Sequence, residues 1–189
     1  MIAALNDTND GQVGTRPSII SVSENDCSSG SRCQCAKCQQ MEHDHGGMAA
    51  PFVVLGNEVA AAVADKHPGM HVDMLAYTFA EDAPNQSAPL PVEVQNNLIA
   101  RWAPIDIDQA YPLARQRSPG SYSSTLAAEQ LASWSAMVAK GGGKLYSWLY
   151  WNNYHDLLMP LPDWFNLAED IQLLAEHGAR GIFAEVCTA

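Results

Sequence analysis

The sequence predicts an α/β fold in which parallel strands, separated by helices, form a barrel or an open sheet. The first observation is alternation, because short β-branched and aromatic runs take turns with amphipathic segments, a pattern typical of parallel strands joined by right-handed crossovers. The second is that polar and aromatic residues follow the carboxyl ends of the strands, the end that carries the chemistry in barrels. This placement favours a barrel, and a five-stranded open sheet is the alternative.

Five strands are expected, each a short apolar run bounded by turn residues. They cover residues 18–23, 71–77, 97–103, 144–150 and 180–185. Helical spacing of apolar residues predicts helices over 52–66, 123–140 and 163–176. The connection between the second and third strands is too short for a full helix, and 27–47, rich in Ser, Gly, Cys and His, is expected to be a long loop. We expect residues 1–17 to be an irregular N-terminal segment and residues 18–189 to form the barrel domain.

The composition is that of a globular chain. Hydrophobic residues make up 47% of the 189 residues and charged ones 16%, unlike the charge-rich composition of disordered chains. The net charge of −11, with only ten Lys and Arg, argues against a nucleic-acid partner, because phosphate binding needs clustered cations. No apolar run approaches the roughly 20 residues of a membrane span, and the N-terminus lacks the basic and apolar regions of a signal peptide. The sequence therefore predicts no membrane span and indicates no compartment.

Several motifs occur in a fixed order along the chain. They include Ser21-Val22-Ser23-Glu24-Asn25-Asp26, Cys33-Gln34-Cys35-Ala36-Lys37-Cys38, Arg101-Trp102-Ala103-Pro104-Ile105 and Leu145-Tyr146-Ser147-Trp148-Leu149-Tyr150. With them, the sequence resembles the bacterial family called domain of unknown function 4838. The resemblance implies a glycoside hydrolase-like (β/α)8 TIM-type barrel, distantly similar to the α-glucuronidases. It also implies that the five strands are the last five of eight, that an N-terminal barrel segment precedes them, and that full-length relatives are secreted. Cys27-Ser28-Ser29 stand where family members usually have glycines, and position 24 is often not acidic in the family.

Glu24, Asp26 and Glu185 are the candidate catalytic residues. They lie at or just past the ends of the first and last expected strands, so a closed barrel would direct them toward its mouth. Glycoside hydrolysis needs one carboxyl group that protonates the leaving oxygen and a second that acts as nucleophile or activates water. We assign Glu24 as the acid and Glu185 as its partner. In the structural alternative, Asp26 caps a loop and Glu185 is a solvated carboxylate.

Aromatic residues and one arginine are the candidate ligands of a sugar. The substrate-binding candidates are Tyr77, Arg101, Trp102, Tyr150, Trp151 and His155. Aromatic faces can stack on pyranose rings, although aromatic residues more generally pack in cores. Polar neighbours favour Trp151 and Tyr154 as the exposed ones. Arg101 is suited to clamp a carboxylate such as a uronate, and a salt bridge to Glu24 or Asp26 is the alternative.

Four of the five cysteines lie close together in the sequence. The candidate metal ligands are Cys27, Cys33, Cys35 and Cys38, with His43 or His45 as further candidates for a fourth ligand. Thiolates at this spacing suit a soft ion, and structural zinc is the candidate cofactor. A loop tied by one disulfide, or free thiols, are the alternatives.

Together these patterns indicate a carbohydrate-active protein whose ligand is a uronic-acid-bearing or related polysaccharide. We expect the isolated chain to be inactive as an enzyme if three barrel strands are missing. The alternatives from other classes are a non-catalytic carbohydrate-binding barrel and a metal-organised structural module.

Overall fold

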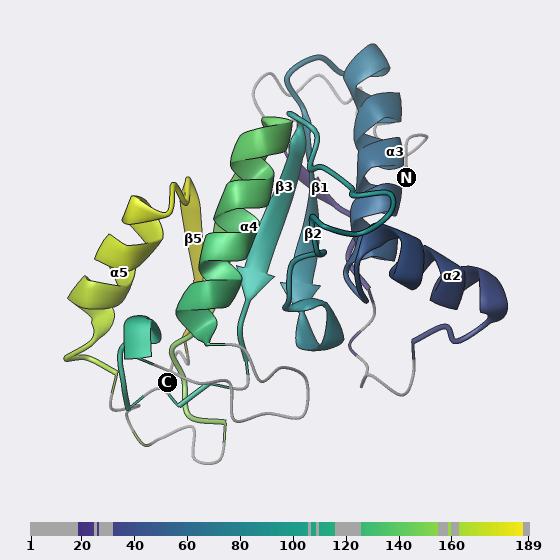
Figure 1. The fold of residues 1–189 in the computed structure, drawn as a ribbon. Helices are drawn as coiled ribbons and strands as arrows, with labels where there is room; N and C mark the ends of the chain where they lie inside the picture. Colours follow the sequence, from purple (N-terminus) through teal and green to yellow (C-terminus); the bar gives the residue numbers. More distant parts are fainter. Residues whose placement is uncertain are drawn as a thin grey trace.

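Five parallel strands form a curled half-barrel in the computed structural model (Figure 1). The structure describes residues 19–24, 26, 32–105, 107–108, 110–115, 126–154, 159 and 163–186. The strands are β1 (Ile19–Ser21), β2 (His71–Tyr77), β3 (Leu98–Ala103), β4 (Lys144–Tyr150) and β5 (Gly181–Glu185). They are hydrogen-bonded in the order of the sequence, from β1 to β5. The prediction of an α/β fold with the strands of a partial barrel is therefore confirmed.

Helices connect the strands and lie on one side of the sheet (Figure 1). They are α2 (Ala36–His45), α3 (Ala50–Lys66), α4 (Ala127–Gly141) and α5 (Leu167–Glu176), with the short 3-10 helices η2 (Thr78–Ala80) and η3 (Leu113–Arg115). The crossover between β2 and β3 contains only η2, as its length predicts. Parallel strands need such crossovers, and their helices cover the face against which they pack.

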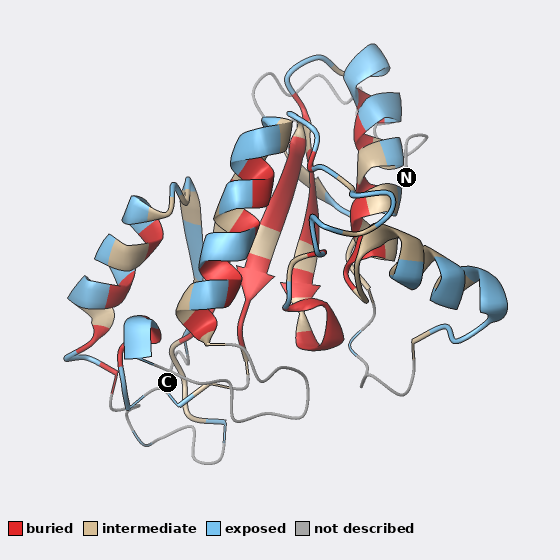
Figure 2. Ribbon diagram, in the orientation of Figure 1, coloured by how far each residue is buried: buried red, intermediate tan, exposed pale blue. Residues whose placement is uncertain are grey.

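The core lies between the sheet and these helices, and Figure 2 shows buried residues on the facing sides of both. Residues at every second position of β2 and β3, such as Met74 and Trp102, point into this layer, because successive side chains of a strand alternate between faces. From α4, Leu131 and Trp134 pack there at helical spacing. Fully burying side chains of this size contributes about 1.5–3 kcal/mol each.

The opposite face of the sheet carries the intervening residues and is polar and aromatic. Register sets Leu75 beside Arg101, and Arg101 beside Tyr146. It also sets Tyr150 beside Glu185. Lys144 and His71 meet at the amino-terminal side of this face, and burial together with the Lys144 charge lowers the pKa of His71. This face, which is the concave side of the curled sheet, is therefore where a binding site is expected.

Helix α2 differs from the sequence prediction, which assigned residues 27–47 to a loop. Its ten residues contain none that is buried, so the apolar periodicity that identifies an amphipathic helix is missing. The helix ends at Gly46, whose φ of 96° is a left-handed conformation that glycine adopts without a Cβ clash. Residues 1–17, expected to be irregular, lie outside the described part of the chain.

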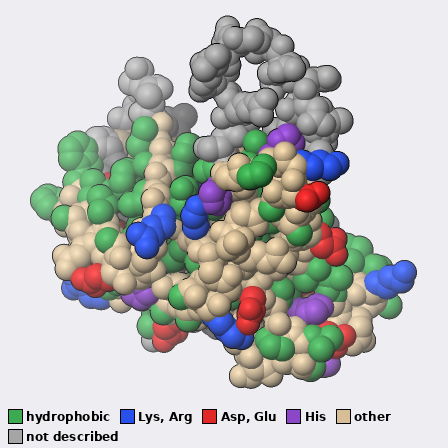
Figure 3. Space-filling model, turned by 90° about the horizontal axis from the view of Figure 1, so that it is seen from above, with side chains coloured by type: hydrophobic (Ala, Val, Ile, Leu, Met, Phe, Trp, Pro, Cys, Tyr) green, Lys and Arg blue, Asp and Glu red, His purple; other side chains and the backbone are tan. Residues whose placement is uncertain are grey.

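Within the described residues, no single helix is long and apolar enough to cross a membrane. Helices α2 and α3 meet the length and composition criteria only as a pair, which is bent by 88°. Viewed from the amino ends of the strands, Lys and Arg side chains are interspersed with Asp, Glu and His (Figure 3). This face thus presents a mixed charge distribution.

Candidate functional site

The carboxyl ends of the strands bring together tyrosines and carboxylates. Tyr77 ends β2, Tyr150 ends β4 and Glu185 ends β5, whereas Asp26 lies beyond the end of β1. The carboxyl ends of parallel strands meet at one edge of the sheet, which is where barrels and open α/β sheets bind ligands. We call the group Asp26, Tyr77, Tyr150, Tyr154 and Glu185, with the adjoining Trp148, the carboxyl-end site.

Glu185 is held by two hydrogen bonds from aromatic side chains. Trp148 Nε1 donates to Glu185 Oε2 at 3.2 Å, and the Tyr154 hydroxyl donates to Glu185 Oε1 at 2.7 Å. The Trp148 ring packs against Phe183, its partner in the β4–β5 register, with 4.1 Å between ring centroids. These contacts orient the Glu185 carboxylate at the rim of the sheet, rather than leaving it as a freely solvated terminal group.

Tyrosine rings connect Glu185 with the far side of the site. The ring centroid of Tyr150 lies 6.4 Å from that of Tyr77 and 6.2 Å from that of Tyr154. The Tyr77 hydroxyl donates to Asp26 Oδ1 at 3.3 Å. Burial, followed by the charges of neighbouring groups including Glu185, raises the pKa of the Tyr150 hydroxyl. Burial and the hydrogen bond to Glu185 raise the pKa of Tyr154 as well, so both phenols stay protonated and able to donate hydrogen bonds.

Glu81 is a carboxylate of this region that the sequence reasoning missed. It is fully buried, its Oε1 accepts a hydrogen bond from the Ile105 amide at 3.3 Å, and its negative charge contributes to the raised pKa of Tyr150. Thr78, with a φ of 50°, lies in the turn between Tyr77 and Glu81. The signal in the sequence is a lone carboxylate four residues beyond a strand that ends in tyrosine.

Glu24 differs from the other carboxylates because it has no hydrogen bond to another described residue. Both of its carboxylate oxygens are buried. Burial raises the pKa of Glu24 from 4.5 to about 7, because removal from water disfavours the charged form. The structure therefore brings Asp26 to Tyr77 and Glu185 to Trp148 and Tyr154, but it joins Glu24 to neither group by a hydrogen bond.

Arg101 forms an ion pair with Asp73 of the neighbouring strand, not with Glu24 or Asp26 as one sequence interpretation had it. Asp73 is buried and Arg101 is largely so. The guanidinium carbon of Arg101 also lies 6.0 Å from the centre of the Trp148 ring, within the range of a cation–π contact. Arg101 thus contacts the carboxyl-end site through the Trp148 ring. The signal for its partner in the sequence is Asp73, a lone acidic residue within a mostly apolar strand.

A second group of reactive side chains lies at the N-terminal end of α2. The sulfur atoms of Cys33, Cys35 and Cys38 all lie within 4.8 Å of one another, an arrangement that could hold a metal ion. Hydrogen bonds from the backbone N–H of Cys38 and from the thiols of Cys33 and Cys38 lower the pKa of Cys35 to about 7. Hydrogen bonds with the thiols of Cys33 and Cys35 raise the pKa of Cys38 to about 12. Cys27 lies outside the described residues.

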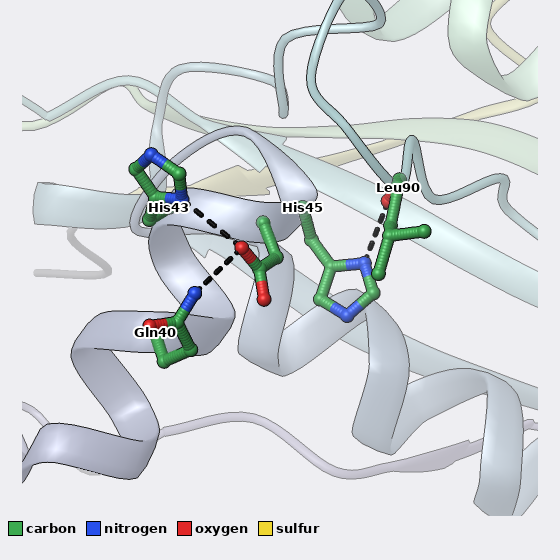
Figure 4. Close-up of polar contacts among 5 residues, drawn as sticks. Gln40, His43, His45 and Leu90 are labelled. Carbon is green, nitrogen blue, oxygen red and sulfur yellow. Dashed lines mark hydrogen bonds and ion pairs between the residues drawn. The ribbon is translucent and has the colours of Figure 1, made fainter.

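His43 and His45 do not join this cysteine group. Both lie in the last turn of α2, and Figure 4 shows their contacts: His43 Nδ1 lies 3.0 Å from Asp44 Oδ1, and His45 Nδ1 lies 2.6 Å from the Leu90 carbonyl oxygen. His43 lies eight positions after Cys35, which corresponds to about 12 Å at 1.5 Å per residue. The interpretation that either histidine completes the ligand set is therefore wrong.

A comparison with protein families identifies the family of this chain. The model of the family described as "Domain of unknown function (DUF4838)" matches residues 9–188. The chain belongs to this family. No curated protein and no solved structure matches the sequence.

One substrate-binding prediction for this DUF4838 domain needs correction. Trp102 is fully buried, and its Nε1 donates to Gln130 Oε1 of α4 at 3.3 Å, so it lies in the core and not in the carboxyl-end site. Trp151 packs partly against the core, although Tyr154 is 52% exposed as expected. His155 lies outside the described residues of the domain.

Proposed function

We propose that the carboxyl-end site of this DUF4838 domain binds a carbohydrate. The observation that carries the proposal is the oriented Glu185 carboxylate, which is surrounded by Trp148, Tyr150 and Tyr154 at the edge where barrels bind ligands. Aromatic rings offer flat apolar surfaces to the C–H faces of pyranose rings. The protonated phenols and the carboxylate supply donors and acceptors for sugar hydroxyls.

We further propose that the site hydrolyses glycosidic bonds, with Glu24 as the proton donor. A general acid must hold its proton near neutral pH, and a pKa of about 7 suits Glu24 to that role. Glu185 is the proposed partner, acting as nucleophile or activating water while the proton of Glu24 goes to the leaving oxygen. A separation of about 5–5.5 Å between the two carboxyl groups would indicate retention, and about 6.5–9.5 Å would indicate inversion. In this proposal, upstream strands of a longer polypeptide complete the barrel.

The charges around the site bear on which sugar it accepts. Asp26, Glu81 and Glu185 are acidic, and Arg101, which lies 6.0 Å from the Trp148 ring, already pairs with Asp73. This balance favours a neutral pyranose over an ionised uronate, because unlike charges attract and like charges repel. The proposed substrate is therefore a uronic-acid-bearing polysaccharide whose neutral sugar residues occupy the site.

Isothermal titration calorimetry with a neutral oligosaccharide and its uronic-acid-bearing counterpart tests the binding proposal. We expect binding by the wild-type domain, at least tenfold weaker binding by Trp148→Ala and Tyr154→Phe, and unchanged binding by the control Tyr111→Phe. Tyr111 is an exposed tyrosine in the β3–α4 connection. Binding that is equal in all four proteins would remove the carboxyl-end site from consideration.

Hydrolysis of the same oligosaccharides by the full-length protein separates an enzyme from a binding barrel. Glu24→Gln should bind sugar normally and lose turnover if Glu24 is the acid. Unchanged turnover would exclude Glu24 from the mechanism. Binding without turnover in the wild type would identify a non-catalytic carbohydrate-binding barrel.

A metal-organised structural module is the second candidate role, favoured by the three clustered sulfur atoms. Zinc is the proposed ion, since thiolates are among its preferred ligands. This role concerns a different part of the domain and is compatible with carbohydrate binding. Zinc content alone, measured on the purified protein, separates it from an arrangement of free thiols.

A further inference from the structure

The spacing of the three sulfur atoms is closer to that of metal ligands than to that of a disulfide. A zinc–sulfur bond is about 2.3 Å long, so two thiolates on a tetrahedral ion lie about 3.8 Å apart. The sulfur atoms of Cys33, Cys35 and Cys38 all lie within 4.8 Å of one another, so a small inward movement would suffice. A disulfide of about 2.05 Å would join one pair and leave the third thiol free. A single bound ion would explain why all three sulfur atoms lie close together.

Burial of its own side chains does little to stabilise helix α2. None of its ten residues is buried, and isolated helices shorter than about 12–15 residues are marginal in water. Its C-terminal end is held to the 85–90 segment, because the Leu90 amide donates to the Asp44 carbonyl at 2.8 Å and the Asn85 amide donates to the Gly46 carbonyl at 2.8 Å. The cysteine group lies at the opposite, N-terminal end.

An ion pair between Arg32 and Glu42 places Cys33, the first cysteine of the group, beside α2. Arg32 Nε donates to Glu42 Oε1 at 3.0 Å, and a terminal nitrogen of Arg32 donates to Glu42 Oε2 at 3.3 Å. This two-point contact fixes geometry better than a single ion pair does. It folds the residue preceding Cys33 back along α2, so that Cys33 meets Cys35 and Cys38 at the first turn. The thiols are therefore pre-organised, which lowers the cost of binding an ion.

We propose that Cys33, Cys35 and Cys38 bind a soft divalent ion of the zinc class, which fastens the N-terminal turn of α2 to residues 32–35, which directly precede it. The inference rests on the metal-module role proposed above, to which it adds a clamping function, and it is independent of the carbohydrate site. It makes the metal a structural clamp that complements the contacts at the other end of the helix. A tetrahedral ion accepts one more ligand, and water fills that position where no fourth side chain reaches it.

Zinc content and hydrogen exchange test the clamp. Protein purified under reducing conditions and dialysed against a small excess of zinc should retain about one zinc per chain. Cys35→Ser should lose most of it, whereas Cys187→Ser, the same chemical change at a cysteine outside the group, should retain it. Removing zinc from the wild type with a chelator should speed amide exchange at least tenfold in residues 36–45 and leave β2 and β3 unchanged. This comparison needs no variant and is unaffected by any folding defect of Cys35→Ser.

Three results would overturn the proposal. The first is wild-type protein that stays metal-free although its thiols react with a thiol reagent. The second is equal zinc retention by Cys35→Ser and the wild type. The third is zinc binding that leaves amide exchange in α2 unchanged, which would remove the role as a clamp. Because sugar titration reports on the other site, failure here leaves the carbohydrate proposal standing.

Discussion

Replacing Glu24 with Gln should stabilise the domain above pH 7 and have little effect near pH 4. Burial raises the pKa of Glu24 from 4.5 to about 7, so the folded state holds this proton more tightly than the unfolded chain does. The free energy of unfolding is therefore highest below the unfolded pKa, and it falls as the pH rises through the folded pKa. Glutamine carries no titrating proton and removes this decline.

The size of the effect follows from the pKa values. A change from 4.5 to about 7 corresponds to ~3 kcal/mol at ~1.4 kcal/mol per pH unit. Because the side chain is only partly removed from solvent, screening reduces the expected gain to ~2 kcal/mol. For a domain of this length, that gain would raise the Tm by ~4–8 °C.

Urea denaturation followed by far-ultraviolet circular dichroism, repeated from about pH 4 to about pH 8, measures this difference. Glu58→Gln is the matched control, because Glu58 is exposed on α3 and the same substitution there should leave the pH dependence unchanged. The reasoning fails if Glu24→Gln and the wild type lose stability in parallel as the pH rises. It also fails if the control shifts as much as the Glu24 variant.

Two further substitutions test the sheet and its packing through the same denaturation assay. Asp73→Asn should cost ~3–5 kcal/mol, because it leaves Arg101 buried without its partner, and adding Arg101→Met should recover part of that loss; a double variant as unstable as the sum of the single ones would contradict the pairing. Gly141→Ala should be more destabilising than Gly56→Ala. A Cβ at Gly141 would collide with the Val94 backbone, whereas at Gly56 it meets a flexible leucine side chain at 2.9 Å, and the reverse order would count against the packing described.

The sheet could be predicted because its strands carry their own signals. The predicted bounds of the second and fourth strands, 71–77 and 144–150, coincide with β2 and β4, since each follows a glycine-containing turn and consists mostly of apolar and aromatic residues. Helix α2 could not be predicted in this way. It buries no side chain, so the contacts that hold it lie in distant segments and leave no periodic trace in its sequence.

The carboxyl-end site was predictable in part. Its location followed from strand ends, which placed Tyr77, Tyr150 and Glu185 at one edge before any pairing was known. The partner of Arg101 depends on the register of β2 against β3, and a single sequence does not specify register between strands. Trp102 could have been recognised as a core residue, because it stands in the two-residue phase of Leu98 and Ala100.

The placement of the tryptophans gives the domain a set of separate optical reporters. Trp102 and Trp134 are fully buried in the core, whereas Trp164 is 67% exposed. Trp148 lies between them in exposure and contacts Glu185 through its indole nitrogen. Bound sugar should therefore alter the fluorescence of Trp148 without changing that of the two core residues, and unfolding should shift the core emission to longer wavelength. With Trp151 and Trp164 replaced by Phe, one intrinsic spectrum would distinguish ligand binding from loss of the fold.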